Sequence, residues 1–145
     1  MNNQKRLRRA FSLLELLIVI AILGLLAAMV TPALMDKADK AKRDQVCIQM
    51  AEIKKALDFF KIDNGIYPDT EEGLEALMQN PDEDKYPAYS VKPYLEKRLP
   101  KDPWKQSFTY INDGDDIELI SYGSDRKEGG EEFAKDIFFT QECQK

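Results

Sequence analysis

Acidic residues gather in one segment near the end of this 145-residue chain. In the segment SYGSDRKEGGEEFAKDI, Asp125 and Asp136 flank a Gly-Gly pair, and between them lie Glu128, Glu131 and Glu132. Carboxylate oxygens on a flexible loop suit calcium, which binds about 6 to 8 oxygen ligands, backbone carbonyls included. The spacing is not that of an EF-hand. Residue types alone leave two interpretations open, a solvated acidic loop and a calcium-binding loop, and the solvated loop is the simpler one.

The rest of the composition argues against enzymatic chemistry. The chain has no histidine, so it lacks the usual general base near neutral pH and the most common zinc ligand. Its formal net charge is -5, which does not favour a nucleic-acid partner. We therefore expect a protein that is not an enzyme and does not bind nucleic acid.

Cys47 and Cys143 are the two cysteines of the chain. In an oxidising compartment, two cysteines within one small domain can form a disulfide. Spacing along the sequence does not determine the distance between them in the fold. A disulfide and two free thiols both remain open.

A long hydrophobic segment near the N-terminus carries a single acidic residue, Glu15. The segment from Leu16 to Met35 has no charged residue and is close to the roughly 20 residues that span a bilayer. It is too long for a cleaved secretory signal, whose apolar stretch has about 7 to 15 residues. A membrane anchor fits better, with four basic residues kept in the cytoplasm: Lys5, Arg6, Arg8 and Arg9. Neither interpretation explains Glu15, because an acidic residue near the bilayer centre costs roughly 2.5 kcal/mol or more.

The stretch RRAFSLLELLIVIAILGLLAAMVTPAL resembles the class III leader of type IV pilins and pseudopilins. In that family a membrane peptidase cleaves before a phenylalanine, which becomes an N-methylated N-terminus, and a glutamate occupies the fifth mature position. The resemblance implies cleavage between Ala10 and Phe11, methylation of the Phe11 amine, and a role in assembly for Glu15. Ala10 replaces the glycine that usually precedes the cleaved bond.

Cleavage would give Glu15 a partner in the membrane. The new amine of Phe11, from the same chain or from the next subunit, can pair with the Glu15 carboxylate. A buried unpaired charge costs several kcal/mol, whereas a well-paired charge approaches neutrality. The alternative is a glutamate near the interface that reaches water.

Two residues of the apolar segment are poor helix formers in water, Gly24 and Pro32. The resemblance implies that the helix can bend or melt at these positions during assembly. Pro32 removes one intrahelical hydrogen bond, so we expect a kink there.

A helical pattern continues beyond the membrane segment. Apolar residues recur there at intervals of four and three, which places them on one helix face: Val46, Met50, Ile53, Leu57 and Phe60. Asn64-Gly65 is a helix stop signal. The sequence therefore predicts one helix from Phe11 to Asn64, whose outer half packs under a small head domain.

The head is predicted to combine a short helix, a long loop and a small sheet. The helix is expected from Glu71 to about Gln79, capped by Asp69 or Thr70. Residues 81–104 are rich in proline and charge, which predicts a surface loop. SFTYI and DIELISY alternate as strands do, with a tight turn at NDGDD between them, and a third short strand is expected over residues 137–140.

Three head motifs sharpen the resemblance. DNGIYPDTEEGLEAL, LPKDPW and SYGSDRKEGGEEFAKDI resemble, in the same order, the pattern of the major pseudopilin of type II secretion systems. That family has a calcium site in the last motif. The resemblance implies that Ca²⁺ is held by Asp125 and Asp136, by Glu132 as a third acidic position, and by the backbone carbonyls of Tyr122 and Lys127.

The expected fold is α+β and type IV pilin-like, with a long N-terminal helix, half of it transmembrane, packed on a small head with an antiparallel sheet. Four regions follow from this assignment. Residues 1–10 are a cytoplasmic leader, 11–35 the transmembrane and assembly half of the helix, 36–64 its outer half, and 65–145 the head with a calcium loop at 121–137. One departure from the family is Lys105, where glycine is frequent after the tryptophan.

The resemblance implies a non-catalytic major subunit of a periplasmic pseudopilus that helps to move folded proteins across the outer membrane. Expected partners are copies of the chain, minor pseudopilins, the inner-membrane assembly platform with its ATPase, and the prepilin peptidase, which is also the N-methyltransferase. The expected location is the bacterial inner membrane, spanned once, with the head in the periplasm. Two alternatives are a type IV pilin for adhesion, motility or DNA uptake, and a membrane-anchored calcium-binding domain that never polymerises.

Overall fold

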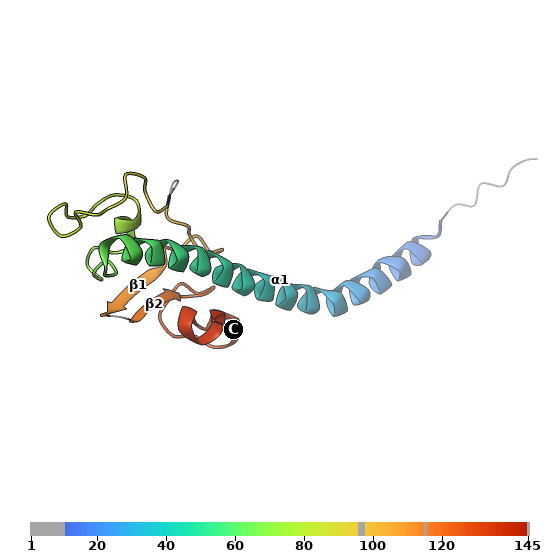
Figure 1. Cartoon of the computed structure of the whole chain (residues 1–145). Helices are drawn as coiled ribbons and strands as arrows, with labels where there is room; N and C mark the ends of the chain where they lie inside the picture. The colour runs from blue at the N-terminus through green and yellow to red at the C-terminus, as the bar shows by residue number, and fades with distance from the viewer. Residues whose placement is uncertain (1–10, 96–97, 115, 145) are drawn as a thin grey trace, which may run out of the picture. The chain divides into compact units, whose positions relative to one another are not determined.

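A computed structural model of the chain describes residues 11–95, 98–114 and 116–144. The chain divides into two compact units, one ending at Ala38 and the other beginning at Asp39. Helix α1, Leu13–Asn64, contributes residues to both units (Figure 1).

Helix α1 begins and ends at the expected signals. At its start, the Ser12 hydroxyl accepts a hydrogen bond from the Leu14 N–H at 3.2 Å, as N-cap serines do. At its end, Gly65 has a φ of 84° and donates its N–H to the Lys61 carbonyl at 2.7 Å. The prediction of one helix up to Asn64 is confirmed, and its start lies two residues later than expected.

The outer half of α1 supplies the core of the head. The five residues of the predicted apolar face are all fully buried: Val46, Met50, Ile53, Leu57 and Phe60. They form one cluster with buried side chains from later segments, among them Leu77, Leu119 and Ile137. Burying a side chain of this kind contributes about 1.5 to 3 kcal/mol.

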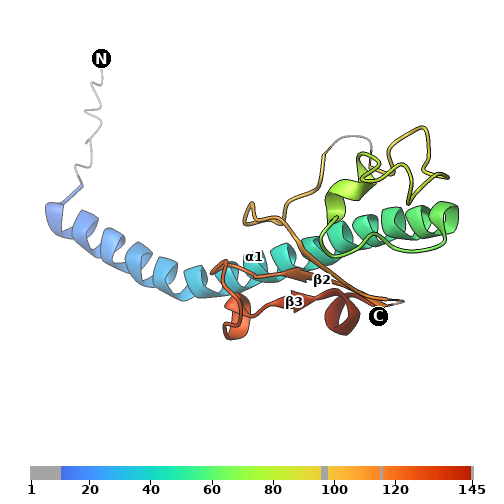
Figure 2. The same ribbon diagram turned by 90° about the vertical axis from the view of Figure 1, so that its left-hand side faces the viewer.

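Three antiparallel strands form the sheet in the order β1-β2-β3. They are β1 (Thr109–Asp113), β2 (Asp116–Ser121) and β3 (Ile137–Phe138). The hairpin turn contains Gly114 at a φ of 85°, and β3 is shorter than expected because the π-helical turn η3 (Phe139–Cys143) follows it directly. In Figures 1 and 2, the sheet and the loop segment 66–95 (green to yellow) lie along different sides of the outer part of α1.

The prediction of a helix from Glu71 to Gln79 is wrong. Only the 3₁₀ turn η1 (Leu74–Leu77) forms there, and Gly73, at a φ of 64°, interrupts the backbone directly before it. Thr70 does not cap this turn, because its hydroxyl accepts the Asn112 N–H of β1 at 2.9 Å and donates to the Asn112 carbonyl at 3.3 Å. A contact with a distant strand therefore replaces the local cap.

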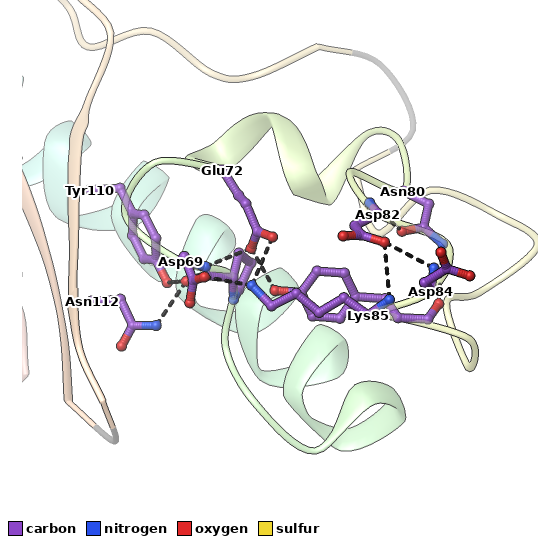
Figure 3. Close-up of polar contacts among 10 residues, drawn as sticks. Asp69, Glu72, Asn80, Asp82, Asp84, Lys85, Tyr110 and Asn112 are labelled. Atoms are coloured by element: carbon purple, nitrogen blue, oxygen red, sulfur yellow. Dashed lines mark hydrogen bonds and ion pairs between the residues drawn. The ribbon is translucent and has the colours of Figure 1, made fainter.

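The long loop is coil, as predicted, but it is anchored by a buried tyrosine. Tyr86 is fully buried, and its hydroxyl donates to Glu72. Next to it, the Lys85 ammonium lies 2.8 Å from Glu72 and 2.5 Å from Asp69 (Figure 3). This network joins the loop to the segment that follows α1.

The network shifts the pKa values of Tyr86 and Glu72. Burial, together with the hydrogen bond to Glu72, raises the pKa of Tyr86 to about 12. Burial by itself would raise the pKa of Glu72, but hydrogen bonds from Lys85, Tyr86 and the Asp69 N–H outweigh burial and hold that pKa below its ordinary value. Glu72 therefore stays ionised, and the ion pair with Lys85 persists at neutral pH.

Candidate functional site

The first half of α1 has an apolar surface on all sides. Every leucine, isoleucine, valine and methionine from Leu13 to Val30 is exposed. By length and composition, α1 is the one helix among residues 11–95, 98–114 and 116–144 that could cross a membrane. Such a surface must be covered by lipid or by other protein chains.

Glu15 lies in the first turn of α1, close to the residue that would become the N-terminus. Phe11 directly precedes the capping residue Ser12, and its side chain is exposed. Glu15 and the backbone nitrogen of Phe11 therefore lie at the same end of the helix, where an acidic side chain also interacts favourably with the helix dipole. Ala10 lies outside the described residues, so cleavage and methylation remain predictions.

The helix assignment runs without interruption through Gly24 and Pro32. A Cβ atom added at Gly24 would meet no atom within 4 Å, so packing within the chain does not require glycine there. The assembly roles of Gly24 and Pro32, and the kink at Pro32, remain predictions.

The acidic loop between β2 and β3 contains a buried carboxylate oxygen that lacks a partner. Asp136 is only 5% exposed, and its Oδ2 accepts the Gly129 N–H at 2.9 Å. Its Oδ1 is buried and accepts no hydrogen bond from the residues that the structure describes. Buried polar atoms without partners are rare in native proteins. An unpaired carboxylate oxygen in an acidic loop fits a bound cation.

Asp125 and a backbone carbonyl converge on Gly130 in the same loop. One oxygen of Asp125, Oδ1, accepts the Lys127 N–H at 3.1 Å. The other oxygen of Asp125, Oδ2, lies 3.2 Å from the position that a Cβ atom on Gly130 would occupy. The carbonyl oxygen of Ala134 lies 2.4 Å from the same position. Nothing in the sequence singles out Ala134, because any residue type can supply a backbone carbonyl.

Carboxylates alone do not complete a metal site here. Across the part of the chain that the structure describes, no group of three or more Asp, Glu, Cys or His side chains is arranged to hold a metal ion. Glu132 is exposed and has a positive φ of 51°. A calcium ion in this loop would therefore need backbone carbonyls among its ligands, and the ligand roles expected for Glu132, Tyr122 and Lys127 remain predictions.

Sequence reasoning missed Asp102, which connects the LPKDPW segment to the start of the acidic loop. Asp102 is 4% exposed, and its Oδ1 accepts the N–H groups of Trp104 at 3.0 Å and Gln106 at 2.8 Å. Its Oδ2 accepts the hydroxyl of Ser121 at 2.8 Å, and that hydroxyl oxygen accepts the Gly123 N–H at 3.4 Å. The sequence feature that could have indicated this role is an aspartate that lies between two prolines.

Lys105 closes the same turn in a conformation that favours glycine. Its φ is 69°, and its N–H donates to the Asp102 carbonyl at 2.8 Å. A non-glycine residue in the left-handed region costs roughly 1 to 2 kcal/mol. The glycine expected from the family would avoid this cost.

Replacing Asp102 with alanine should lower the free energy of unfolding by about 3 kcal/mol, because two buried donors and one partly buried donor lose their acceptor. Urea denaturation of the detergent-solubilised full chain measures the effect. Asp84→Ala is the matched control, since Asp84 is exposed and its loss should change stability by no more than about 0.5 kcal/mol. Equal midpoints for the two variants would contradict the role of Asp102.

The two cysteines form a disulfide, which decides between the alternatives left open by the sequence. Cys47 of α1 and Cys143 of η3 are joined, with their Cα atoms 5.1 Å apart. Nearby, Arg43 donates to the Lys135 carbonyl at 2.8 Å and to the Glu142 carboxylate at 2.8 Å. The end of the acidic loop and the C-terminal segment are thus fastened to α1.

Comparison with known families decides the assignment. The profile of "Type II secretion system (T2SS), protein G" matches residues 33–140. The chain belongs to the type II secretion system protein G family. A second profile, the "Prokaryotic N-terminal methylation motif", matches residues 5–31 and so spans Ala10, Phe11 and Glu15. Members of this family are structural pseudopilins, which assemble with other pseudopilins and are not enzymes.

Proteins named type II secretion system core protein G are similar over most of their length. The protein from Vibrio cholerae is 39% identical over 137 residues, covering 93% of this chain and 93% of the relative. The Pseudomonas aeruginosa protein is 40% identical over 136 residues, covering 92% of this chain and 96% of the relative. The Escherichia coli K12 protein is 38% identical over 128 residues, covering 86% of this chain and 88% of the relative.

A solved structure confirms the predicted fold class. The crystal structure of the major pseudopilin from the type 2 secretion system of enterohaemorrhagic Escherichia coli is 34% identical in sequence to this chain. It matches with a TM-score of 0.61, over 72% of this chain and 91% of that one. The methylation motif and the apolar helix are consistent with anchoring in a membrane.

Proposed function

We propose that the chain is the major structural subunit of a type II secretion pseudopilus. It polymerises through its N-terminal helix into a periplasmic filament that helps to drive folded proteins across the outer membrane. The observation that carries this proposal is the family match over residues 33–140, preceded by a methylation motif over residues 5–31. A type IV pilin for adhesion, motility or DNA uptake would share the N-terminal motif but not the match over the head.

The proposal includes a location and a set of partners. Before assembly the chain spans the bacterial inner membrane once, with its head in the periplasm. The exposed apolar half of α1 supports this placement. The partners are other copies of the chain, minor pseudopilins, the assembly platform with its ATPase, and the peptidase that cleaves and methylates the N-terminus.

Mass spectrometry of the chain extracted from membranes tests the proposed processing. We expect the first residue to be Phe11, with one added methyl group on its amine. Ala10→Gly is the matched variant, because it restores the usual family residue and should be cleaved at least as completely. A wild-type chain that still begins at Met1 in the presence of the peptidase would contradict the leader assignment.

We also propose that the acidic loop binds calcium. The support is the buried Oδ1 of Asp136, which has no partner among the described residues, and the approach of Asp125 and the Ala134 carbonyl to Gly130. Asp125 and Asp136 would hold the ion, together with Glu132 and the carbonyls of Tyr122 and Lys127. The ion would supply positive charge that relieves repulsion between these carboxylates and orders the loop.

Calcium should raise the melting temperature of the wild-type chain, and Asp125→Ala should abolish that increase. An ion present at 100 times its Kd stabilises a protein by about 2.7 kcal/mol. Thermal melts in calcium and in chelator, for both proteins, measure the difference. Glu128→Ala is the matched control, since it removes one charge from the same loop but no expected ligand. If the wild type melts at the same temperature in calcium and in chelator, the loop does not bind the ion.

A further inference from the structure

A pocket lies between the outer half of α1 and the segment that precedes β1. Its volume is about 680 Å³, and all of its lining residues belong to the unit that begins at Asp39. Leu99 and Pro100 give it an apolar wall. Three further lining residues are basic and exposed: Arg98, Lys101 and Lys105. A pocket of roughly 300 to 1,000 Å³ with apolar walls and a few converging polar groups is typical of sites for small ligands.

The three basic side chains of this pocket form no ion pair with a carboxylate in the part of the chain that the structure describes. Several other basic residues of the same unit do have such partners: Arg43 pairs with Glu142, Lys54 with Asp58, and Lys85 with Asp69 and Glu72. The carboxylate that lines the pocket, Asp102, is 4% exposed and uses both oxygens in hydrogen bonds within the chain. Positive charge is therefore concentrated here, although the whole chain has a formal net charge of -5, and it favours an anionic ligand.

Two of the cations belong to a turn that the fold holds in place. The Asp102 N–H donates to the Gln106 carbonyl at 2.9 Å, and the Asp102 carboxylate accepts the Gln106 N–H at 2.8 Å. On the other side of the turn, the side chain of Gln49 in α1 donates to the Lys101 carbonyl at 2.9 Å. These bonds fix the backbone at Lys101 and around Lys105. A site that is ordered before its ligand arrives loses less conformational entropy on binding.

Lys105 reaches the pocket from a backbone conformation that glycine would adopt more easily. Its φ of 69° lies in the left-handed region, where a side chain is unfavourable. Residues held in such conformations are found disproportionately at functional sites. At this position the side chain contributes one of the three cations of the pocket, which glycine would not.

We propose that this pocket binds the phosphate group of a phosphate monoester, carried either by a free small molecule or by a lipid headgroup. The planar guanidinium of Arg98 matches two phosphate oxygens, and Lys101 and Lys105 add point charges. A phosphate monoester carries close to two negative charges and three acceptor oxygens, so it suits three cations better than a single carboxylate does. The site does not require polymerisation, so it is independent of the proposed function.

Nuclear magnetic resonance titration of the full chain in detergent micelles tests the site. Two probes are added to separate samples at constant ionic strength, sodium glycerol 3-phosphate and phosphatidic acid mixed into the micelles. We expect at least one probe to cause saturable changes in the backbone amide signals of Lys101 and Lys105. A response to glycerol 3-phosphate shows that a free monoester is sufficient, whereas a response to phosphatidic acid alone identifies a lipid headgroup as the ligand.

Lys105→Gly separates binding from folding, because it removes a cation and also relieves the backbone. We expect the variant to bind the responding probe about tenfold more weakly, while its melting temperature stays equal to that of the wild type or rises. Lys92→Gln is the matched control, since Lys92 is an exposed lysine of the long loop that does not line the pocket. Its loss should change the affinity by less than about twofold.

Three results would overturn the proposal. The first is the absence of saturable changes with both probes, and the second is wild-type affinity in Lys105→Gly. The third is binding of a polyglutamate peptide without binding of either phosphate probe, which would assign the pocket to an acidic protein segment instead.

Discussion

Removing the Cys47–Cys143 disulfide should lower the free energy of unfolding of the chain by about 4 kcal/mol. The bond joins residues that are 96 positions apart. In the chain-entropy description, closing a loop of about 100 residues is worth about 4.7 kcal/mol, and native disulfides of small domains contribute about 2 to 5 kcal/mol. Since domains of this size are stable by only about 5 to 15 kcal/mol, a large share of the total depends on this bond.

Urea denaturation of the detergent-solubilised full chain measures this effect. The oxidised wild type should unfold at a higher urea concentration than the double variant Cys47→Ser and Cys143→Ser. Reductant should shift the wild type to the midpoint of the double variant and leave the double variant unchanged, which controls for other effects of the reagent. Overlapping curves for oxidised and reduced wild type would show that the bond does not stabilise the head.

Glu15→Gln should reduce filament assembly about 100-fold or more. Glutamine keeps the size of the side chain and removes only its charge, so the amine of Phe11 would lose its partner in a medium of low dielectric constant. Breaking a buried ion pair by removing one member costs about 3 to 5 kcal/mol, and each 1.4 kcal/mol corresponds to a factor of ten in an equilibrium constant.

Two controls separate assembly from processing. The Glu15→Gln chain should still begin at Phe11, which mass spectrometry shows, so that failure to assemble is not failure to be cleaved. Glu83→Gln, which removes one charge from the exposed loop of the head, should form filaments at the wild-type rate. Wild-type rates for Glu15→Gln would mean that the acid reaches water and has no role in joining subunits.

Residue periodicity predicted α1 and the strands of the sheet, but the helix expected from Glu71 to Gln79 is replaced by a short 3₁₀ turn. The spacing from Val46 to Phe60 identified the core face, and Asn64-Gly65 identified the end of α1. The alternation in DIELISY identified β2. These signals are local, because each depends on residues within a few positions of one another. They failed at Thr70, whose hydroxyl bonds to Asn112 in β1, a contact that local sequence does not reveal.

The candidate site was only partly predictable for the same reason. Asp136 and Asp125 were expected from the resemblance, and in the structure they lie beside Gly129 and Gly130, while their role as calcium ligands remains a prediction. The carbonyl of Ala134 and the pairing of Cys47 depend on how distant segments meet, so no spacing rule identifies them. Residue type likewise did not show that Asp102 is buried with three donors around it.

Electron microscopy of filaments isolated from cells that produce the chain together with its secretion machinery tests the central claim most directly. We expect helical filaments whose main component is this chain, and mass spectrometry of the isolated material should show that it begins at Phe11. The opposite result is a correctly cleaved chain that stays as single subunits in the membrane fraction while the machinery is active. That result would show that the apolar helix is an anchor and that the chain does not polymerise.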